Sequence, residues 1–260
     1  MPISPRAAGL ARLAVLLPGT GSDEVFVTAA FAGPLRAVGI PVLAVAPGSG
    51  AEVVANYLRA LDQAMEDGEG LLVGGVSLGA QVAARWAAGR AGRGLAGLLL
   101  ALPAWTGDPG SAPAATAAAA SAAALRRDGL AATIERTRAR TPEWLGGELA
   151  RAWSRHADGL ADSLEAAAAT PGPTEGELAA LRVPVGLVGL RDDPVHPLAV
   201  ARRWHALLPR SALVTSTLEA LGRDRASIGR AAVLAWLRAR PPLTTGVVGD
   251  GARPGAAGPG

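Results

Sequence analysis

One short stretch constrains the fold more than any other: an apolar run that ends in glycines, carries a serine and continues into a helical segment. It reads Leu-Leu-Val-Gly-Gly-Val-Ser-Leu-Gly over residues 71–79, and the helical pattern continues to Arg90. Within it, Gly75, Ser77 and Gly79 form a G-x-S-x-G pattern. Such a pattern predicts a serine on a tight strand-to-helix turn, because small residues on both sides leave room for neighbouring backbone. The alternative is a glycine-rich turn with an ordinary N-cap serine.

Two backbone N–H groups near this serine are candidates for binding a negative charge that develops on a substrate oxygen. The N–H of Leu78 lies in the first turn of the expected helix, where the helix dipole favours negative charge. Thr20 or Gly21, in the loop Pro-Gly-Thr-Gly over residues 18–21, is the second candidate donor. This loop matches neither a phosphate-binding loop nor G-x-G-x-x-G, so its alternative is a plain strand-to-helix turn.

Apolar runs of strand length alternate with helical stretches along most of the chain. This alternation predicts an α/β fold: a mostly parallel sheet of about six strands with helices on both faces. The first helix is expected to be interrupted at Gly33-Pro34, because proline removes a backbone donor and crowds the preceding turn. The carboxyl ends of parallel strands meet at one edge of the sheet. One rim should therefore bring together residues 18–22, Ser77, residues 103–105 and residues 191–197.

The strand pattern also predicts how the chain is divided. Residues 11–106 and 182–240 are expected to form the core. Between them, residues 107–181 are rich in alanine and lack a strand pattern, which predicts a helical cap insertion. A flexible N-terminus over residues 1–10 and a disordered Gly- and Pro-rich tail over 241–260 complete the prediction.

Composition argues against several classes of function. The absence of cysteine excludes disulfides and cysteine-based metal sites. The basic residues are all arginine, but they are scattered and the formal net charge is only +3, so no nucleic-acid partner is expected. No apolar run approaches the length of a membrane span, and no clear cleavage site follows the short apolar start. We therefore expect a cytoplasmic protein with no membrane partner, no cofactor and no metal.

A loop after the expected fifth strand carries a candidate acid and a candidate base. It reads Arg-Asp-Asp-Pro-Val-His-Pro over residues 191–197. Either Asp192 or Asp193 can supply a carboxylate, and each has a cap on the next helix as its alternative role. His196 is the default base because the fold places it on the rim with Ser77, although its ring can instead fix the loop by hydrogen bonding. A separation of only three residues argues against Asp193 orienting His196 as in an ordinary triad.

These features together resemble the α/β-hydrolase superfamily over roughly residues 11–240. The resemblance rests on the G-x-S-x-G elbow, the strand-end loop, the helical insertion and the Asp-Pro-x-x-Pro sequence over 193–197. It implies Ser77 as nucleophile and Asp193 as the acid, with Asp192 as its rival. In that family the histidine normally follows the last strand, often as Gly-His, but here Gly222-Arg223 stands there. Arginine is not a general base near neutral pH.

The remaining histidines and the tryptophans give weaker candidates. His205 is expected to be exposed, and His156 reaches the site only if its helix lines the pocket. Trp105, together with Trp144 and Trp153 of the insertion, is a candidate wall for an apolar pocket, with an ordinary core position as the alternative.

Two classes of function follow from these residues. The first is a serine hydrolase that acts on an ester, thioester or related acyl small molecule through Ser77. The second is a catalytically silent or weakened protein of the same fold that binds a small molecule or partner, suggested by Arg223 at the expected histidine position. The distance from Ser77 Oγ to the nearest imidazole nitrogen separates the two.

Overall fold

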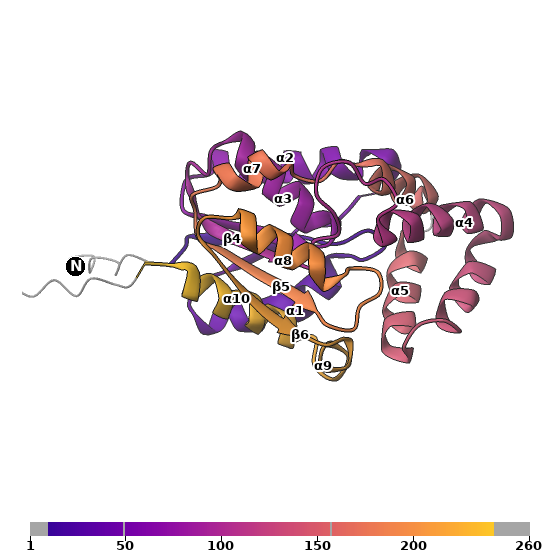
Figure 1. The fold of residues 1–260 in the computed structure, drawn as a ribbon. Helices are drawn as coiled ribbons and strands as arrows, with labels where there is room; N and C mark the ends of the chain where they lie inside the picture. Colours follow the sequence, from indigo (N-terminus) through magenta and orange to yellow (C-terminus); the bar gives the residue numbers. More distant parts are fainter. Residues whose placement is uncertain (1–9, 49, 157, 242–260) are drawn as a thin grey trace, which may run out of the picture.

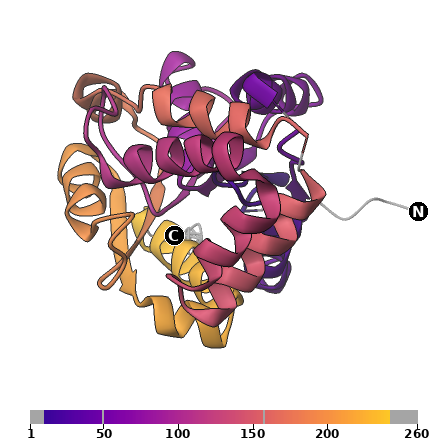
Figure 2. The ribbon, with the colours of Figure 1, turned by 90° about the vertical axis from the view of Figure 1, so that its right-hand side faces the viewer.

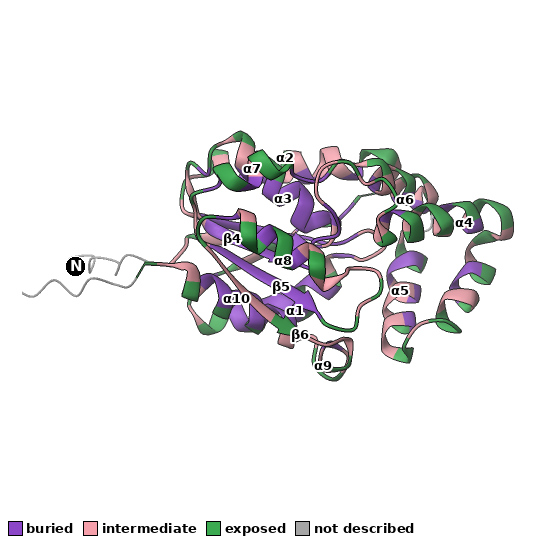
Figure 3. Ribbon diagram, in the orientation of Figure 1, coloured by how far each residue is buried: buried purple, intermediate pink, exposed green. Residues whose placement is uncertain are grey.

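Six apolar runs form one parallel sheet with the strand order β2-β1-β3-β4-β5-β6 (Figure 1). The computed structural model describes residues 10–241 except 49 and 157. All residues of β3 and β5 are buried, as expected for central strands covered on both faces (Figure 3). The predicted sheet of about six parallel strands is confirmed. The strands are β1 (Leu13–Leu17), β2 (Val42–Ala44), β3 (Leu71–Val76), β4 (Leu95–Ala101), β5 (Val185–Leu190) and β6 (Ser211–Ser216).

Helices cover both faces of the sheet and bury a separate apolar layer on each. On one face, Tyr57, Leu61 and Trp204 pack with the strands; on the other, Phe31 and Trp236 do so. These side chains come from α2, α8, α1 and α10, and α3 lies on the face of α2 (Figure 1). The core helices are α1 (Glu24–Ala37), α2 (Val53–Glu66), α3 (Leu78–Gly89), α8 (Leu198–Leu207), α9 (Leu218–Arg223) and α10 (Ala226–Ala239), with a short 3-10 helix, η1 (Gly50–Glu52), before α2.

The segment between β4 and β5 contains only helices among its described elements. These are α4 (Pro113–Arg138), α5 (Glu143–Arg155), α6 (Leu160–Ala169) and α7 (Glu175–Ala180). Figures 1 and 2 show α4 and α5 stacked beyond one end of the sheet, whereas α7 packs against α3 and α8. Hydrogen bonds from α5 to Asp23, a few residues after β1, place α5 at the carboxyl ends of the strands.

The first helix departs from the sequence prediction. Helix α1 runs without interruption through Gly33 and Pro34, so the expected break is wrong. Pro34 is buried in the helix, and α1 packs closely on α10, where a Cβ at Gly229 would lie 2.1 Å from the carbonyl oxygen of Ala30. Burial of this apolar face outweighs the backbone hydrogen bond that proline removes near the end of the helix.

Three of the remaining predictions concern the ends of the chain and its surroundings. The predicted flexible start over 1–10 and disordered tail over 241–260 fall outside the described residues, apart from Leu10 and Pro241. None of the described helices has the length and apolar character needed to cross a membrane. The cytoplasmic location stays a prediction.

Candidate active site

The turn between β3 and α3 holds Ser77 in an unusual backbone conformation. Its φ and ψ are 53° and −115°, in a region that residues other than glycine rarely adopt. The backbone N–H of Ser77 donates to the carbonyl of Ala101 at 2.9 Å, and its carbonyl accepts from the N–H of Gln81 at 3.1 Å. The side chain makes no capping hydrogen bond to α3, so the alternative of an ordinary N-cap serine is wrong.

The glycines of the motif are required by the strand next to the elbow. A Cβ at Gly75 or at Gly79 would lie 2.2 Å from the carbonyl oxygen of Leu17, the last residue of β1. Contacts this short do not occur in folded proteins, so any side chain here must displace backbone. The pattern G-x-S-x-G therefore reflects close packing of β1 against the turn that holds Ser77.

We expect Gly79→Ala to lower the free energy of unfolding by about 3 kcal/mol, because the added methyl group forces backbone apart. Gly89→Ala, in the same helix, is the matched control, since nothing lies within 4 Å of a Cβ there. We expect it to be neutral or to stabilise by about 0.5 kcal/mol through its helix propensity. Chemical denaturation of both variants measures the difference, and equal stabilities would contradict the packing argument.

The loop after β5 brings an imidazole and a carboxylate to Ser77. The Nε2 atom of His196 lies 2.9 Å from Ser77 Oγ, and its Nδ1 atom lies 2.9 Å from Asp193 Oδ2. The expectation that three residues of separation prevent Asp193 from orienting His196 is therefore wrong. The reason is a tight turn in which Asp193 Oδ1 accepts the backbone N–H groups of Val195 at 2.8 Å and His196 at 3.1 Å. This turn folds the ring back over the second carboxylate oxygen.

The environment of this pair favours one charge state and one tautomer. The side chains of Asp193 and His196 are only 7% and 16% exposed. Burial acts to raise the pKa of Asp193, but the hydrogen bond and charge of His196 and the two backbone N–H groups outweigh it and hold this pKa below its usual value. A carboxylate only accepts hydrogen bonds, so in the neutral ring Nδ1 carries the proton and Nε2 is left to accept from the Ser77 hydroxyl.

Two other candidates from the sequence lie outside this arrangement. Asp192 Oδ1 accepts the backbone N–H of Leu218 at 2.8 Å and so caps the start of α9. Arg223 pairs with Glu219 one turn earlier in α9 at 2.5 Å, and its side chain is 79% exposed. Within the described residues, no hydrogen bond joins either side chain to Ser77 or His196.

The loop after β1 passes directly beside Ser77. A Cβ at Gly19 would lie 3.3 Å from the Cβ of Ser77 and 3.2 Å from the carbonyl oxygen of Val76. The carbonyl of Gly19 accepts from Ser22 N–H at 3.1 Å, which closes a turn around Thr20. The N–H of Leu78 lies in the first turn of α3 and has no acceptor within that helix. Both candidate oxyanion donors therefore belong to segments that flank Ser77.

A small cavity of about 20 Å³ lies next to this loop. Its walls come from the loop after β1, from the start of α2 and from the insertion helices. Helix α5 contributes Trp153, and His156 follows it, so the condition set for His156, that its helix lines a pocket, is met. The lining residues are Gly19, Thr20, Gly21, Ser22, Pro47, Gly48, Val53, Tyr57, Ala152, Trp153, His156, Leu160 and Ser163.

The other aromatic and histidine candidates lie elsewhere. Trp105 is buried, donates its indole N–H to the carbonyl of Thr170 at 3.3 Å and is not among the residues that line this cavity. Trp144 packs under the guanidinium of Arg225, 4.3 Å from the ring centre. His205 is exposed, as predicted.

Helix α5 is held to the core by an ion network that sequence reasoning missed. Asp23 is fully buried, caps α1 and accepts from Arg151 at 2.7 Å and from Arg155 at 3.0 Å. Arg155 also donates to Glu24 at 2.8 Å. The two arginines stand four residues apart, a spacing that places them on one face of a helix. That spacing was the only available signal, because Asp23 lies 128 residues before Arg151.

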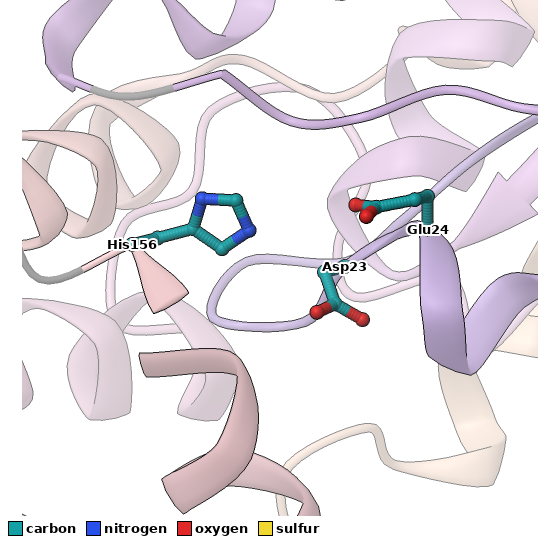
Figure 4. A group of neighbouring side chains, drawn as sticks. All are labelled: Asp23, Glu24 and His156. Atoms are coloured by element: carbon teal, nitrogen blue, oxygen red, sulfur yellow. The ribbon is translucent and has the colours of Figure 1, made fainter. Parts of the chain in front are cut away.

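Three side chains of this region have ligand atoms within 4.8 Å of one another: Asp23, Glu24 and His156 (Figure 4). Figure 4 shows the Asp23 carboxylate turned away from the gap between His156 and Glu24. Both Asp23 oxygens already accept from Arg151, and the two guanidinium groups oppose a bound cation. The donor set therefore does not fit a metal ion.

We expect Asp23→Asn to lower the free energy of unfolding by about 2 kcal/mol at pH 7, because it removes the buried charge but keeps a residue that caps helices well. Burial acts to raise the pKa of Asp23, but Arg151, the Phe26 N–H and Arg155 hold it below its usual value. The ionised form therefore stabilises the fold above about pH 4, and this contribution is lost as the pH falls further.

Denaturation of wild type and Asp23→Asn between pH 7 and pH 3 tests this, and the difference should shrink at the acidic end. Asp162→Asn removes an exposed partner of Arg126 and is the control, with an expected change below about 1 kcal/mol. A difference between wild type and Asp23→Asn that stays constant with pH would contradict the argument.

Comparison with known proteins adds to this description. No protein-family model matches the chain, and no curated protein matches its sequence. Solved structures do match. An esterase from Thermogutta terrifontis is 20% identical, with a TM-score of 0.64 over 88% of this chain and 90% of its own. A putative non-heme bromoperoxidase from Mycobacterium tuberculosis is 18% identical, with a TM-score of 0.64 over 90% and 94% of the two chains.

An enol-lactonase from Burkholderia xenovorans is also 18% identical, with a TM-score of 0.64 over 89% of this chain and 93% of its own. Identities this low concern the fold and not the chemistry. The strand order, the helices on both faces and these neighbours agree with one another. The chain therefore has the α/β-hydrolase fold that the resemblance predicted.

Proposed function

We propose that the protein is a serine hydrolase that acts on an ester, thioester or related acyl small molecule. Ser77 is the nucleophile, His196 the general base and Asp193 the group that orients the imidazole. The observation that carries the proposal is the chain of two 2.9 Å contacts from Ser77 Oγ through His196 to Asp193. This is the arrangement that activates a serine hydroxyl in acyl transfer.

The proposed reaction has two acyl-transfer steps. Ser77 Oγ attacks the substrate carbonyl carbon while His196 Nε2 takes the hydroxyl proton, and the N–H groups of Leu78 and Thr20 bind the resulting oxyanion. The bond from carbon to the leaving oxygen or sulfur then breaks, and His196 gives its proton to that leaving group. Water repeats the sequence on the acyl-serine, which releases the acid and restores Ser77.

A role for Asp193 beyond orientation follows from charge. The imidazole becomes an imidazolium when it accepts the proton, and a carboxylate at 2.9 Å stabilises that cation. Since Asp193 has a lowered pKa, it stays ionised throughout the neutral range.

The alternative, a catalytically silent protein of the same fold, rested on Gly222-Arg223 at the position where a histidine is expected. The separation of 2.9 Å between His196 Nε2 and Ser77 Oγ favours the enzyme, because a base is within hydrogen-bond reach of the nucleophile. In this proposal the base comes from the loop after β5, and Arg223 takes no part.

Reaction with a fluorophosphonate tests the proposal, because these reagents modify activated serines. We expect one adduct per chain, which peptide mass spectrometry should locate on Ser77. Ser77→Ala and heat-denatured protein are the controls and should remain unlabelled. Failure of the native protein to react, or equal labelling of Ser77→Ala, would overturn the proposed function.

A further inference from the structure

The cavity next to the loop after β1 is surrounded by polar side chains that lack partners. Four of its lining residues have a polar atom that is closed off from solvent and has no hydrogen-bond partner within the described part of the chain. These atoms are Ser22 Oγ, Tyr57 Oη, Trp153 Nε1 and His156 Nε2. Tyr57 is fully buried and Trp153 is 4% exposed. Buried polar groups are nearly always hydrogen-bonded, so four at one cavity point to an occupant that bonds with them.

The size of the cavity restricts that occupant. A volume of about 20 Å³ holds about one group the size of a water molecule. A hydrocarbon chain does not fit, and a methyl group would leave the four polar atoms unsatisfied. A hydroxyl group has the required size and can both donate and accept hydrogen bonds.

The donors and acceptors around the cavity also fit a neutral hydroxyl better than an ion. Trp153 Nε1 only donates, so the occupant has to accept a hydrogen bond. Glu24 Oε2, a buried acceptor without a partner, lies on the far side of the gap from His156 (Figure 4). A cation would face the Trp153 N–H, and an anion would face the Glu24 carboxylate, so both are disfavoured.

The cavity adjoins the proposed catalytic serine. Gly19 lines the cavity and also passes beside Ser77, where its Cβ would lie 3.3 Å from the serine Cβ. Thr20, the proposed oxyanion donor, lies in the same wall. A substrate whose carbonyl oxygen sits at this loop therefore has its neighbouring atoms next to the cavity.

We propose that this cavity is a specificity subsite that receives a hydroxyl group of the substrate, carried close to the scissile carbonyl. The inference rests on the proposed function, since it assumes that a carbonyl carbon reaches Ser77. The substrate class is then a hydroxylated ester or thioester. Trp153 donates to the hydroxyl oxygen, and Tyr57, Ser22 and His156 surround it.

Matched pairs of esters test the proposal. We would compare kcat/KM for 4-nitrophenyl butyrate with its 2-hydroxy and 3-hydroxy analogues, each enantiomer separately, and for ethyl butyrate with 2-hydroxyethyl butyrate. The expected result is a preference of at least about tenfold for one hydroxylated ester over its partner, because the plain ester leaves the buried groups unpaired. In Trp153→Phe, which removes the N–H, this ratio should fall to about one to three.

Trp144→Phe is the matched control, because Trp144 lies on the same helix but outside the cavity, and it should keep the wild-type ratio. Tyr57→Phe is a second cavity variant and should lower the ratio if Trp153→Phe does not fold. Absence of any preference in wild-type protein whose Ser77 reacts with a fluorophosphonate would overturn the subsite alone and leave a cavity that holds only water. Absence of that reaction would overturn the proposed function and the subsite with it.

Discussion

Replacing His196 with alanine is expected to lower kcat for hydrolysis of a 4-nitrophenyl ester by about 10⁴- to 10⁶-fold. The imidazole at 2.9 Å is the base that we assign to the Ser77 hydroxyl, and a serine without a base is a poor nucleophile. The residual rate should come from binding and from the N–H groups of Leu78 and Thr20. Steady-state kinetics with substrate in excess measures the change in kcat.

Arg223→Ala is the control for this experiment, because Arg223 occupies the position at which the resemblance places a histidine. Its side chain is largely exposed and pairs with Glu219, so we expect kcat within about twofold of wild type. A small loss in His196→Ala combined with a large loss in Arg223→Ala would mean that the base is wrongly assigned.

The second large effect is expected for Asp193→Asn, which should lower kcat by about 10⁴-fold. The asparagine oxygen can still accept the N–H groups of Val195 and His196, so the turn should persist. Its amide nitrogen, however, would donate to His196 Nδ1 and so select the tautomer with the proton on Nε2. That tautomer cannot accept the proton of Ser77.

Asp192→Asn is a closely matched control, one residue earlier and with the same chemical change. Asp192 accepts only the N–H of Leu218 at the start of α9, a contact that an asparagine oxygen can also make. We expect kcat to change by less than about threefold. Comparable losses in the two variants would indicate that the loop as a whole is disturbed and that Asp193 has no specific role.

The parts of the site that could be predicted are those with a local sequence signature. The turn at Ser77 follows from an apolar strand, two close glycines and a helical stretch, because only glycine fits beside the backbone of Leu17. Likewise, the parallel sheet follows from repeated apolar runs separated by helical segments. These features depend on neighbours in the sequence and on a few packing rules.

The contact between Asp193 and His196 was rejected although it is also local. Sequence separation alone suggested that the two side chains were too close to pair. The backbone turn, in which Asp193 Oδ1 accepts two N–H groups, sets the direction of both side chains, and that turn is not encoded in the spacing. Geometry within a short loop therefore decided the question.

Long-range effects account for the other differences. Helix α1 continues through Pro34 because it packs against α10, which lies almost 200 residues later in the chain. The ion network between Asp23 and the arginines of α5 depends on where the insertion folds back, and Arg151 offered no local sign of that. Such contacts follow from the tertiary arrangement and not from local pattern.

The most direct test of the central claim is the rate constant for fluorophosphonate modification of Ser77, measured in wild type and in His196→Ala under identical conditions. Both proteins contain the same serine, elbow and oxyanion donors, so the ratio isolates the base. We expect the wild-type rate constant to be larger by a factor of at least about 10³. Equal rate constants would contradict the assignment of His196 as the base that activates Ser77.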